Sequence, residues 1–404
     1  MAKVKLVAVA KDEAAYLPEW IFHHLTIGFD EIDIHVNNTS DNTWELKNKL
    51  KALSQVNFID ADPIFSGGYV FPQEEVYEQA LLSARADGFT HMMFLDIDEF
   101  WFSPSIDFSI KDFIQKHHDK HICSFKWLCK TNETEFSSIY EPLKGNSVRQ
   151  VKTLFNVNLA IKKVDIHNVN VENGEYFLGD GKPWKFGVYH KNASCVRGDY
   201  FSTDVDPFYV VHRMHRSEME YISLLSRGRP ERAMKSKTIF KDNRNGYIKL
   251  ATKKNARDVD VIGREEAAIG YSKFIERFEL EEYLNKAQDF VLNRYKLTLD
   301  NIAKSGADEE EVLNKILSYL TDKKLRAVFK QYQERLNPVR DLKTQAYIKS
   351  AMLLKEAAIN VEKFDLMLAE ELMFKAHVLK PSGRHIAQKL EEYRAELKEQ
   401  QGVN

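Results

Sequence analysis

The sequence predicts an α/β protein, with a doubly wound, mostly parallel sheet followed by an α-helical C-terminal domain. Three observations carry this prediction. Short apolar runs alternate with amphipathic segments over the first hundred residues, as in sheets covered by helices on both faces. The fourth apolar run ends abruptly in carboxylates. From about residue 271 glycine becomes scarce, and Leu, Lys, Glu and Ala recur with helical spacing.

The elements follow from apolar periodicity and from the residues that end each segment. Gly28 and Gly88 lie where glycine commonly ends a helix, and Pro72 lies where proline commonly begins one. We expect strands over 4–10, 31–37, 56–61, 91–95, 122–128, 151–157 and 160–169, and helices over 13–27, 43–53, 72–86, 110–117 and 217–226. We expect a first domain over 1–270, divided at about residue 102, and a helical domain over 271–404 with breaks at Pro338 and Pro381.

The acidic motif lies at 96–99, where the fourth apolar run ends. Carboxyl ends of strands are where open α/β sheets bind ligands. Strand alternation would point Asp96 and Asp98 to the same side, where two carboxylates need a compensating charge. A Mg²⁺ or Mn²⁺ ion supplies that charge and leaves coordination positions open for phosphate oxygens. The motif therefore predicts chemistry on a diphosphate, although a solvated acidic turn would look the same.

Composition excludes several classes of protein. The 404 residues carry a formal charge of −2, which does not favour a nucleic-acid-binding protein. The three cysteines lack CxxC spacing, which argues against a zinc site and a disulfide scaffold and fits a reducing cytoplasm. No GxGxxG or GxxxxGK[ST] motif occurs, and no apolar run is long enough for a signal peptide or a membrane span.

Further candidate residues follow other strands or lie in the irregular middle. Lys11 and Glu13, after the first strand, and Asn37, at the end of the second, are placed to meet the base and ribose of a nucleotide. Arginines after residue 212 have the forked donors that suit phosphate oxygens. The candidates there are Arg213, Arg216 and Arg227. A general base is expected among Asp180, Asp199, Asp204 and His167, and the sequence does not choose among them.

Several segments resemble bacterial family 2-like glycosyltransferases of the GT-A fold, which are related to the family 92 enzymes. The segments are Val7–Glu13 with Glu19-Trp20 and Gly28-Phe29-Asp30, Asn37–Thr43, Gln73 with Tyr77, Leu95–Phe100, Lys152, His167, and His212 through Gly228. The resemblance covers about residues 4–230. Asp12 departs from the family's usual Asn, Asn37 from an acid, and Arg213 from Tyr.

The resemblance implies transfer of a sugar from a nucleotide-sugar, with inversion, to a glycan or lipid-linked glycan in bacterial capsule or lipopolysaccharide synthesis. It implies a Mn²⁺ or Mg²⁺ ion held by Asp96, Asp98 and His212, and a donor site that includes Gln73, Asp96, Arg213 and Arg227. We expect a cytoplasmic protein, with peripheral association at the inner membrane left open. The helical domain is expected to form homo-oligomers.

Two other functions are compatible with the sequence. A sugar nucleotidyltransferase would normally carry a glycine-rich N-terminal loop with a basic residue, which is missing here. A non-catalytic scaffold would act through the C-terminal helices. Substituting Asp98 separates these classes, because only an enzyme would lose sugar transfer while its fold stayed intact.

Overall fold

The computed structural model describes residues 2–172, 174–185, 194–227 and 238–400. The chain forms two compact units. The first comprises residues 1–301 and 311–322, and the second comprises 302–310 and 323–404. This division places residues 271–301 with the sheet, whereas the sequence led us to expect a helical domain from 271 onward.

The N-terminal half of the first unit is a parallel sheet with crossover helices, which confirms the predicted α/β class. Strand β1 pairs with β2 on one side and β4 on the other, and β2 pairs with β3, all in parallel. The strands are β1 Val4–Ala10, β2 Glu31–Val36, β3 Val56–Asp60 and β4 His91–Phe94, and the helices are α1 Leu17–Thr26, α2 Thr43–Lys49, α3 Asp62–Ser66 and α4 Pro72–Ala86.

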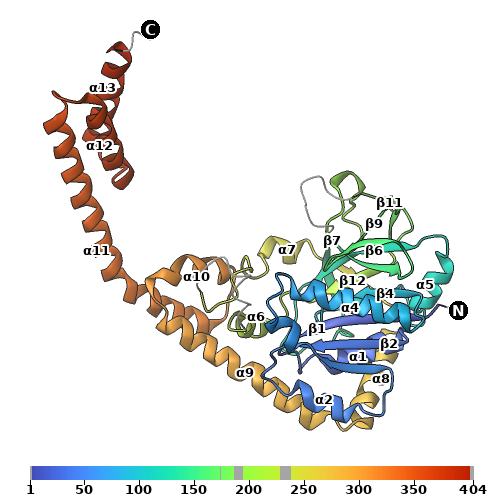
Figure 1. Cartoon of the computed structure of the whole chain (residues 1–404). Coiled ribbons are helices and arrows are strands. Elements are labelled where there is room, and N and C mark those ends of the chain that lie inside the picture. Colours follow the sequence, from blue (N-terminus) through green and yellow to red (C-terminus); the bar gives the residue numbers. More distant parts are fainter. Residues whose placement is uncertain (1, 173, 186–193, 228–237, 401–404) are drawn as a thin grey trace. The chain divides into compact units, whose positions relative to one another are not determined.

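Alternation along β1 explains why helices cover both faces of the sheet. Leu6 and Ala8 belong to the core that α1 and α8 (Arg264–Arg277) also enter. Val7 points the other way, into the core that contains Tyr77 of α4. Figure 1 shows α4 on one side of these strands and α1 with α8 on the other. A strand buried on both faces must be apolar at nearly every position, as β1 is.

The second half of the sheet adds antiparallel strands beyond β4. Its order is β11-β10-β6-β7-β4-β1-β2-β3, with β5 and β13 pairing from the side and β12 lying between β5 and β6. The elements are β5 Glu99–Phe102, α5 Ile110–Lys116, β6 Ile122–Lys130, β7 Leu143–Asn156, β8 Ile161–Val164, β9 Val169–Val171, β10 Tyr176–Leu178, β11 Pro183–Trp184, η1 Gly198–Tyr200, β12 Tyr209–His212, α6 Glu218–Leu225, α7 Leu250–Lys254 and β13 Arg257–Val259. The single strand expected over 160–169 is instead the antiparallel pair β8 and β9.

Two helices complete the first unit, α9 Glu281–Lys304, most of which lies in it, and α10 Glu310–Ile316. The second unit contains η3 Ala307–Glu309, α11 Lys323–Val361, α12 Leu366–Leu379 and α13 Arg384–Gln400, around a core that includes Ala369 and Met373. Pro381 lies in the turn between α12 and α13, as expected, but Pro338 lies inside α11 and does not end it. Proline removes one backbone donor, and on an exposed helix water can bond the carbonyl that is left. Over the described residues, no helix has the length and apolar character needed to cross a membrane.

Candidate functional site

The acidic motif forms a turn and is not a continuation of β4. The strand ends at Phe94, and β5 begins at Glu99. Strand alternation therefore does not apply to Asp96 and Asp98, and the expectation that it would orient both in one direction was wrong. The two carboxylates contact different partners, Asp96 on α4 and β7 and Asp98 on β12.

Asp96 is held by α4 and β7. Gln73 Nε2 donates a hydrogen bond to Asp96 Oδ1 at 3.2 Å, and the Lys152 ammonium lies 3.2 Å from Asp96 Oδ2. Gln73 also donates to the Tyr77 hydroxyl at 2.9 Å. Gln73 and Lys152 orient the Asp96 carboxylate. The side chain is still 37% exposed, so it can accept a hydrogen bond from a ligand.

A fully buried ion pair lies beneath Asp96. The side chains of Lys152 and Glu99 are both 0% exposed, and Lys152 Nζ lies 3.1 Å from Glu99 Oε2. Burial alone lowers the pKa of Lys152, but Asp96 and Glu99 outweigh burial and raise it. Burial raises the pKa of Glu99 well above its usual range, although Lys152 opposes that rise. The same Glu99 oxygen accepts the backbone N–H of Asp96 at 2.8 Å, which fixes the shape of the turn.

Asp98, the last residue of the turn, faces His212, the last residue of β12. β12 pairs antiparallel with β5 so that His212 lies opposite Glu99, and the backbone N–H of Arg213 donates to the Asp98 carbonyl at 2.8 Å. This pairing brings His212 Nε2 to 3.5 Å from Asp98 Oδ2. Burial acts to raise the pKa of Asp98, but His212 and nearby arginines hold it well below its usual range. Asp98 is therefore ionised at neutral pH.

His167 is the candidate base that lies beside the acidic motif. Its ring centroid is 5.2 Å from that of Trp127, which also packs at 4.1 Å against His212. Burial and the charge of Lys152 together lower the pKa of His167 to about 4. His167 Nδ1 lies 3.0 Å from the Val151 carbonyl, so this nitrogen carries the proton and Nε2 keeps its lone pair.

Glu13, just after β1, forms ion pairs with two arginines that flank α6 in the sequence. Glu13 is buried and pairs with Arg216 at 2.9 Å and with Arg227. Arg227 also donates to the Lys11 carbonyl at 3.1 Å. Asn37 is buried at the end of β2, where its backbone N–H donates to the Ala10 carbonyl. The predicted nucleotide residues Lys11, Glu13, Asn37 and Arg227 therefore gather at the carboxyl ends of β1 and β2.

A cavity of about 380 Å³ opens at these strand ends. α9 forms one wall and supplies an aromatic ring, Phe290, together with the polar side chain of Asn293. The lining residues are Lys11, Asp12, Asn38, Ser40, Ser226, Arg227, Phe290, Asn293, Arg294 and Leu297. An aromatic ring beside polar side chains can accommodate a nucleoside.

The departure of Asp12 from the family's Asn has a local explanation in α9. Asp12 has a positive φ of 51°, a conformation that both Asn and Asp tolerate. One carboxylate oxygen accepts the backbone N–H of Ser40 at 2.7 Å, and the other lies 3.1 Å from Arg294. The extra charge of Asp12 is thus paired by a residue outside the segments that carry the resemblance.

Three predicted site residues lie in other surroundings. Asp180 bonds to Lys182 within one turn, and Asp199, 55% exposed, pairs with Arg197. Asp204 likewise pairs at the surface with Arg257. These contacts do not favour Asp180 or Asp199 as the general base, because a base must reach an acceptor bound beside the donor.

Arg213 is buried and paired within the protein. It contacts Glu133 at 2.6 Å, Glu19 at 3.4 Å and the Ser137 carbonyl at 2.6 Å. Those contacts occupy its fork, so the structure favours a structural role for Arg213 over the expected donor binding. Arginine in place of the family's Tyr is accommodated because two carboxylates, Glu19 and Glu133, face it.

Asp98 and His212 are the side chains that could hold a divalent cation, and the described residues offer no third protein ligand beside them. No group of three or more His, Cys, Asp or Glu side chains that could hold an ion occurs among them. Asp96, expected as a ligand, is occupied by Lys152 and Gln73. Mg²⁺ commonly uses one or two carboxylates and takes its other ligands from water and phosphate, so Asp98 is the side chain that would anchor such an ion.

Sequence reasoning missed the basic residues of the segment 238–248. Burial lowers the pKa of Lys241, and the charge of Arg244 helps to lower the pKa of Asp98. Neither lies in a recognisable motif. Their proximity to Asp98 depends on how the chain returns after α6, and local spacing carries no signal of that return.

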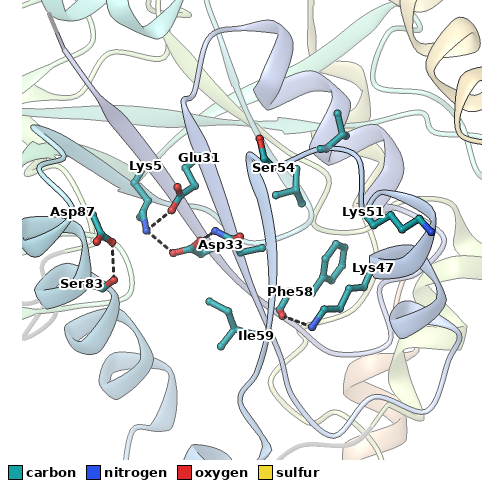
Figure 2. A pocket seen from close by; sticks show the side chains of 13 residues that line it. Lys5, Glu31, Asp33, Lys47, Lys51, Ser54, Phe58, Ile59, Ser83 and Asp87 are labelled. Carbon is teal, nitrogen blue, oxygen red and sulfur yellow. Dashed lines mark hydrogen bonds and ion pairs between the residues drawn. The ribbon is translucent and has the colours of Figure 1, made fainter.

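Another cavity, of about 570 Å³, lies at the opposite ends of the strands. Figure 2 shows Lys5 of β1 pairing there with Glu31 and Asp33, near Ser83 and Asp87 of the C-terminal end of α4. Lys5 pairs at 2.6 Å with Glu31 and 2.8 Å with Asp33. This cavity contains none of the predicted site residues.

No family model and no curated protein matches the sequence. Similar solved structures include the galactosyltransferase LgtC in complex with donor and acceptor sugar analogues, with 16% identity and a TM-score of 0.22 over 38% of this chain and 58% of LgtC. TarS 1–349 of S. aureus in complex with UDP has 11% identity and a TM-score of 0.27, over 74% of this chain and 90% of TarS. HddC of Yersinia pseudotuberculosis has 12% identity and a TM-score of 0.23, over 52% of this chain and 77% of HddC. This chain thus spans less than two thirds of LgtC, and matches of this kind do not say which reaction it performs.

Proposed function

We propose that this chain is an inverting glycosyltransferase that moves a sugar from a nucleotide-sugar to a glycan acceptor, in the synthesis of a bacterial surface polysaccharide. The observation that carries the proposal is the placement of Asp98 opposite His212, next to an arginine cluster and a nucleoside-sized cavity at the carboxyl ends of the parallel strands. The sequence resemblance supports the same reaction.

The donor would lie along the strand ends. Its nucleoside would enter the cavity walled by α9, and its diphosphate would pass Arg227 towards Asp98. Asp98 and His212 would hold a Mn²⁺ or Mg²⁺ ion, which when bound neutralises charge on the departing nucleoside diphosphate. Asp96, oriented by Gln73 and Lys152, would accept a hydrogen bond from a donor hydroxyl.

His167 would act as the general base. In the transfer, the acceptor oxygen bonds to the anomeric carbon as the bond from that carbon to the phosphate oxygen breaks, and the electron pair leaves with the diphosphate. The acceptor proton goes to Nε2 of His167, since Nδ1 already carries a proton. An anionic donor beside the imidazole would raise the pKa of His167 from about 4 towards the working range.

The first test is Asp98→Asn, with Asp107→Asn as the matched control at an exposed aspartate. A panel of nucleotide-sugars is screened with Mn²⁺ for nucleoside diphosphate release and for glycan product. We expect Asp98→Asn to lower transfer at least a hundredfold, because loss of one preorganised electrostatic contact commonly costs that much. The control should match the wild type.

Two outcomes would contradict the proposal. One is transfer by Asp98→Asn within twofold of the wild type, with thermal unfolding unchanged. The other is a product that keeps the anomeric configuration of the donor, which would exclude inversion. Release of pyrophosphate from a nucleoside triphosphate and a sugar phosphate would instead identify a nucleotidyltransferase.

Self-association through the C-terminal helices stays a prediction. α12 buries Ala369 and Met373 within the second unit, while Met367 (69% exposed) and Val378 (60% exposed) face solvent. A helix with apolar side chains on its exposed side as well as its buried side favours contact with another protein surface, such as a second copy of this chain. Light scattering at micromolar concentration checks this, and a monomer would contradict it.

A further inference from the structure

Two basic side chains near Asp98, the buried Lys241 and the partly buried Arg244, have no partner among the described residues. Lys241 is only 9% exposed, and the Nε atom of Arg244 is fully buried. Within the described ranges, neither Lys241 Nζ nor Arg244 Nε has a hydrogen-bond or ion-pair partner. Buried charges are normally paired, because removing an unpaired charge from water costs several kcal/mol. An unpaired cation at such a position indicates an anionic ligand.

The surroundings of these two residues carry an excess of positive charge. Arg227, Asp98 and Glu13 act electrostatically on Lys241, and Asp98, Arg227 and Arg216 act on Arg244. The cations Lys241, Arg244, Arg216 and Arg227 therefore outnumber the two carboxylates, and Glu13 is already paired with Arg216 and Arg227. Burial, together with Arg227 and Arg244, lowers the pKa of Lys241 well below its usual range.

The backbone of the segment 238–248 is fixed at several points. The Lys241 N–H donates to the Leu225 carbonyl at the end of α6, 2.8 Å away. Lys315 of α10 donates to the Asp242 carbonyl at 2.9 Å, and the Tyr247 N–H donates to the Ser318 carbonyl at 2.8 Å. The Tyr247 hydroxyl donates to the Arg216 carbonyl at 2.8 Å. The segment is therefore built into the first unit, which preorganises its two cations.

We infer that Lys241 and Arg244 bind the diphosphate of the donor, beside Asp98. The inference rests on the proposed function and assigns donor binding to residues beyond the resemblance, which ends near residue 230. The fork of Arg244 suits two phosphate oxygens, and the ammonium of Lys241 supplies a compact charge. The excess of cations matches an anion of more than one charge, which a diphosphate is.

The test uses Lys241→Met and Arg244→Met in the full chain, with Lys254→Met as the control at an exposed lysine of α7. Calorimetric titration with inorganic pyrophosphate and with UDP and GDP measures the dissociation constants. We expect each site variant to weaken pyrophosphate binding roughly tenfold or more, because hydrogen bonds to charged groups contribute that much. The control should bind as the wild type does.

Unfolding of the free protein distinguishes ligand binding from a structural role. If Lys241 served only the fold, its loss would lower the unfolding temperature. An unpaired buried charge costs stability, so we expect Lys241→Met without ligand to unfold at the same or a higher temperature than the wild type. A lower unfolding temperature with unchanged pyrophosphate affinity would overturn the inference.

The other outcomes separate this inference from the proposed function. If Asp98→Asn abolishes transfer while both site variants keep wild-type affinity for pyrophosphate and wild-type KM for the donor, the inference fails alone. If the variants raise only the KM of a phosphate-bearing acceptor, the anion belongs to the acceptor and the inference is again wrong. If the variants lose their affinity for pyrophosphate but the wild type turns over no nucleotide-sugar, the anion site is supported and the proposed reaction is wrong.

Discussion

Replacing Lys152 by methionine tests how the buried charges beneath the acidic turn contribute to stability. The ammonium of Lys152 lies 3.1 Å from Glu99 and 3.2 Å from Asp96, and it donates to the Ile166 carbonyl at 3.2 Å. Asp96 is 37% exposed, so solvent screens it and its share is small. Glu99 is 0% exposed and would be left without its cation. Removing one partner of a buried pair costs about 3–5 kcal/mol, and we expect this variant to fall in that range.

A double variant separates the ion pair from packing. In Lys152→Met with Glu99→Gln no fully buried charge is left uncompensated, so we expect it to be more stable than Lys152→Met alone by about 1–3 kcal/mol. Lys163→Met is the matched control: that lysine is 53% exposed and pairs with Glu74 at 3.0 Å. Loss of such a surface pair should change the free energy of unfolding by less than about 1 kcal/mol.

Urea unfolding followed by tryptophan fluorescence measures these differences. All five tryptophans lie before residue 185, so the signal reports on the first unit alone. The reasoning is refuted if Lys152→Met loses less than about 1 kcal/mol, or if the double variant is no more stable than Lys152→Met.

Two further perturbations test other features of the first unit. Burial lowers the pKa of His23 to about 4, from an ordinary value near 6.5, so the unfolded chain binds the extra proton first as pH falls. The free energy of unfolding should therefore fall as the pH is lowered from 6.5 to 4. His23→Gln should reduce this slope by up to about 1.4 kcal/mol per pH unit, whereas the control His118→Gln, at the surface, should leave it unchanged. Urea titrations that give equal slopes for His23→Gln and the wild type would contradict this. The Ser109 hydroxyl caps α5 in a capping box with Asp112, so Ser109→Ala should cost about 1 kcal/mol in unfolding free energy, and an unchanged urea midpoint would contradict that role.

The parallel half of the sheet was predictable because each element is specified locally. Apolar runs bounded by glycine or proline gave β1 to β4 and α4 with errors of at most one residue. The antiparallel half was less predictable. Glu99–Phe102 looks like the end of the acidic motif, and it becomes β5 only because β12 returns beside it. β7 begins at Leu143 with polar residues and Gly145, which give no strand signal.

The same distinction applies to the site. Asp98 and His212 could be singled out because they lie in recognisable motifs, and the structure brings them face to face. The burial of Arg213 could not be foreseen, because its partners Glu19 and Glu133 come from distant segments. Lys241 likewise acquires its significance only from tertiary packing. Local pattern indicates which residues carry chemistry, whereas their pairing depends on contacts between segments far apart in sequence.

The ion pair between Asp12 and Arg294 bears on how this protein can be shortened. A fragment ending at residue 270 would keep every motif of the resemblance and discard α9. It would leave the carboxylate of Asp12, 5% exposed here, without its cation, and it would remove Tyr283, whose hydroxyl donates to the Ala14 carbonyl at 3.1 Å. A fragment meant to fold alone should therefore extend through Asp322, where the first unit ends.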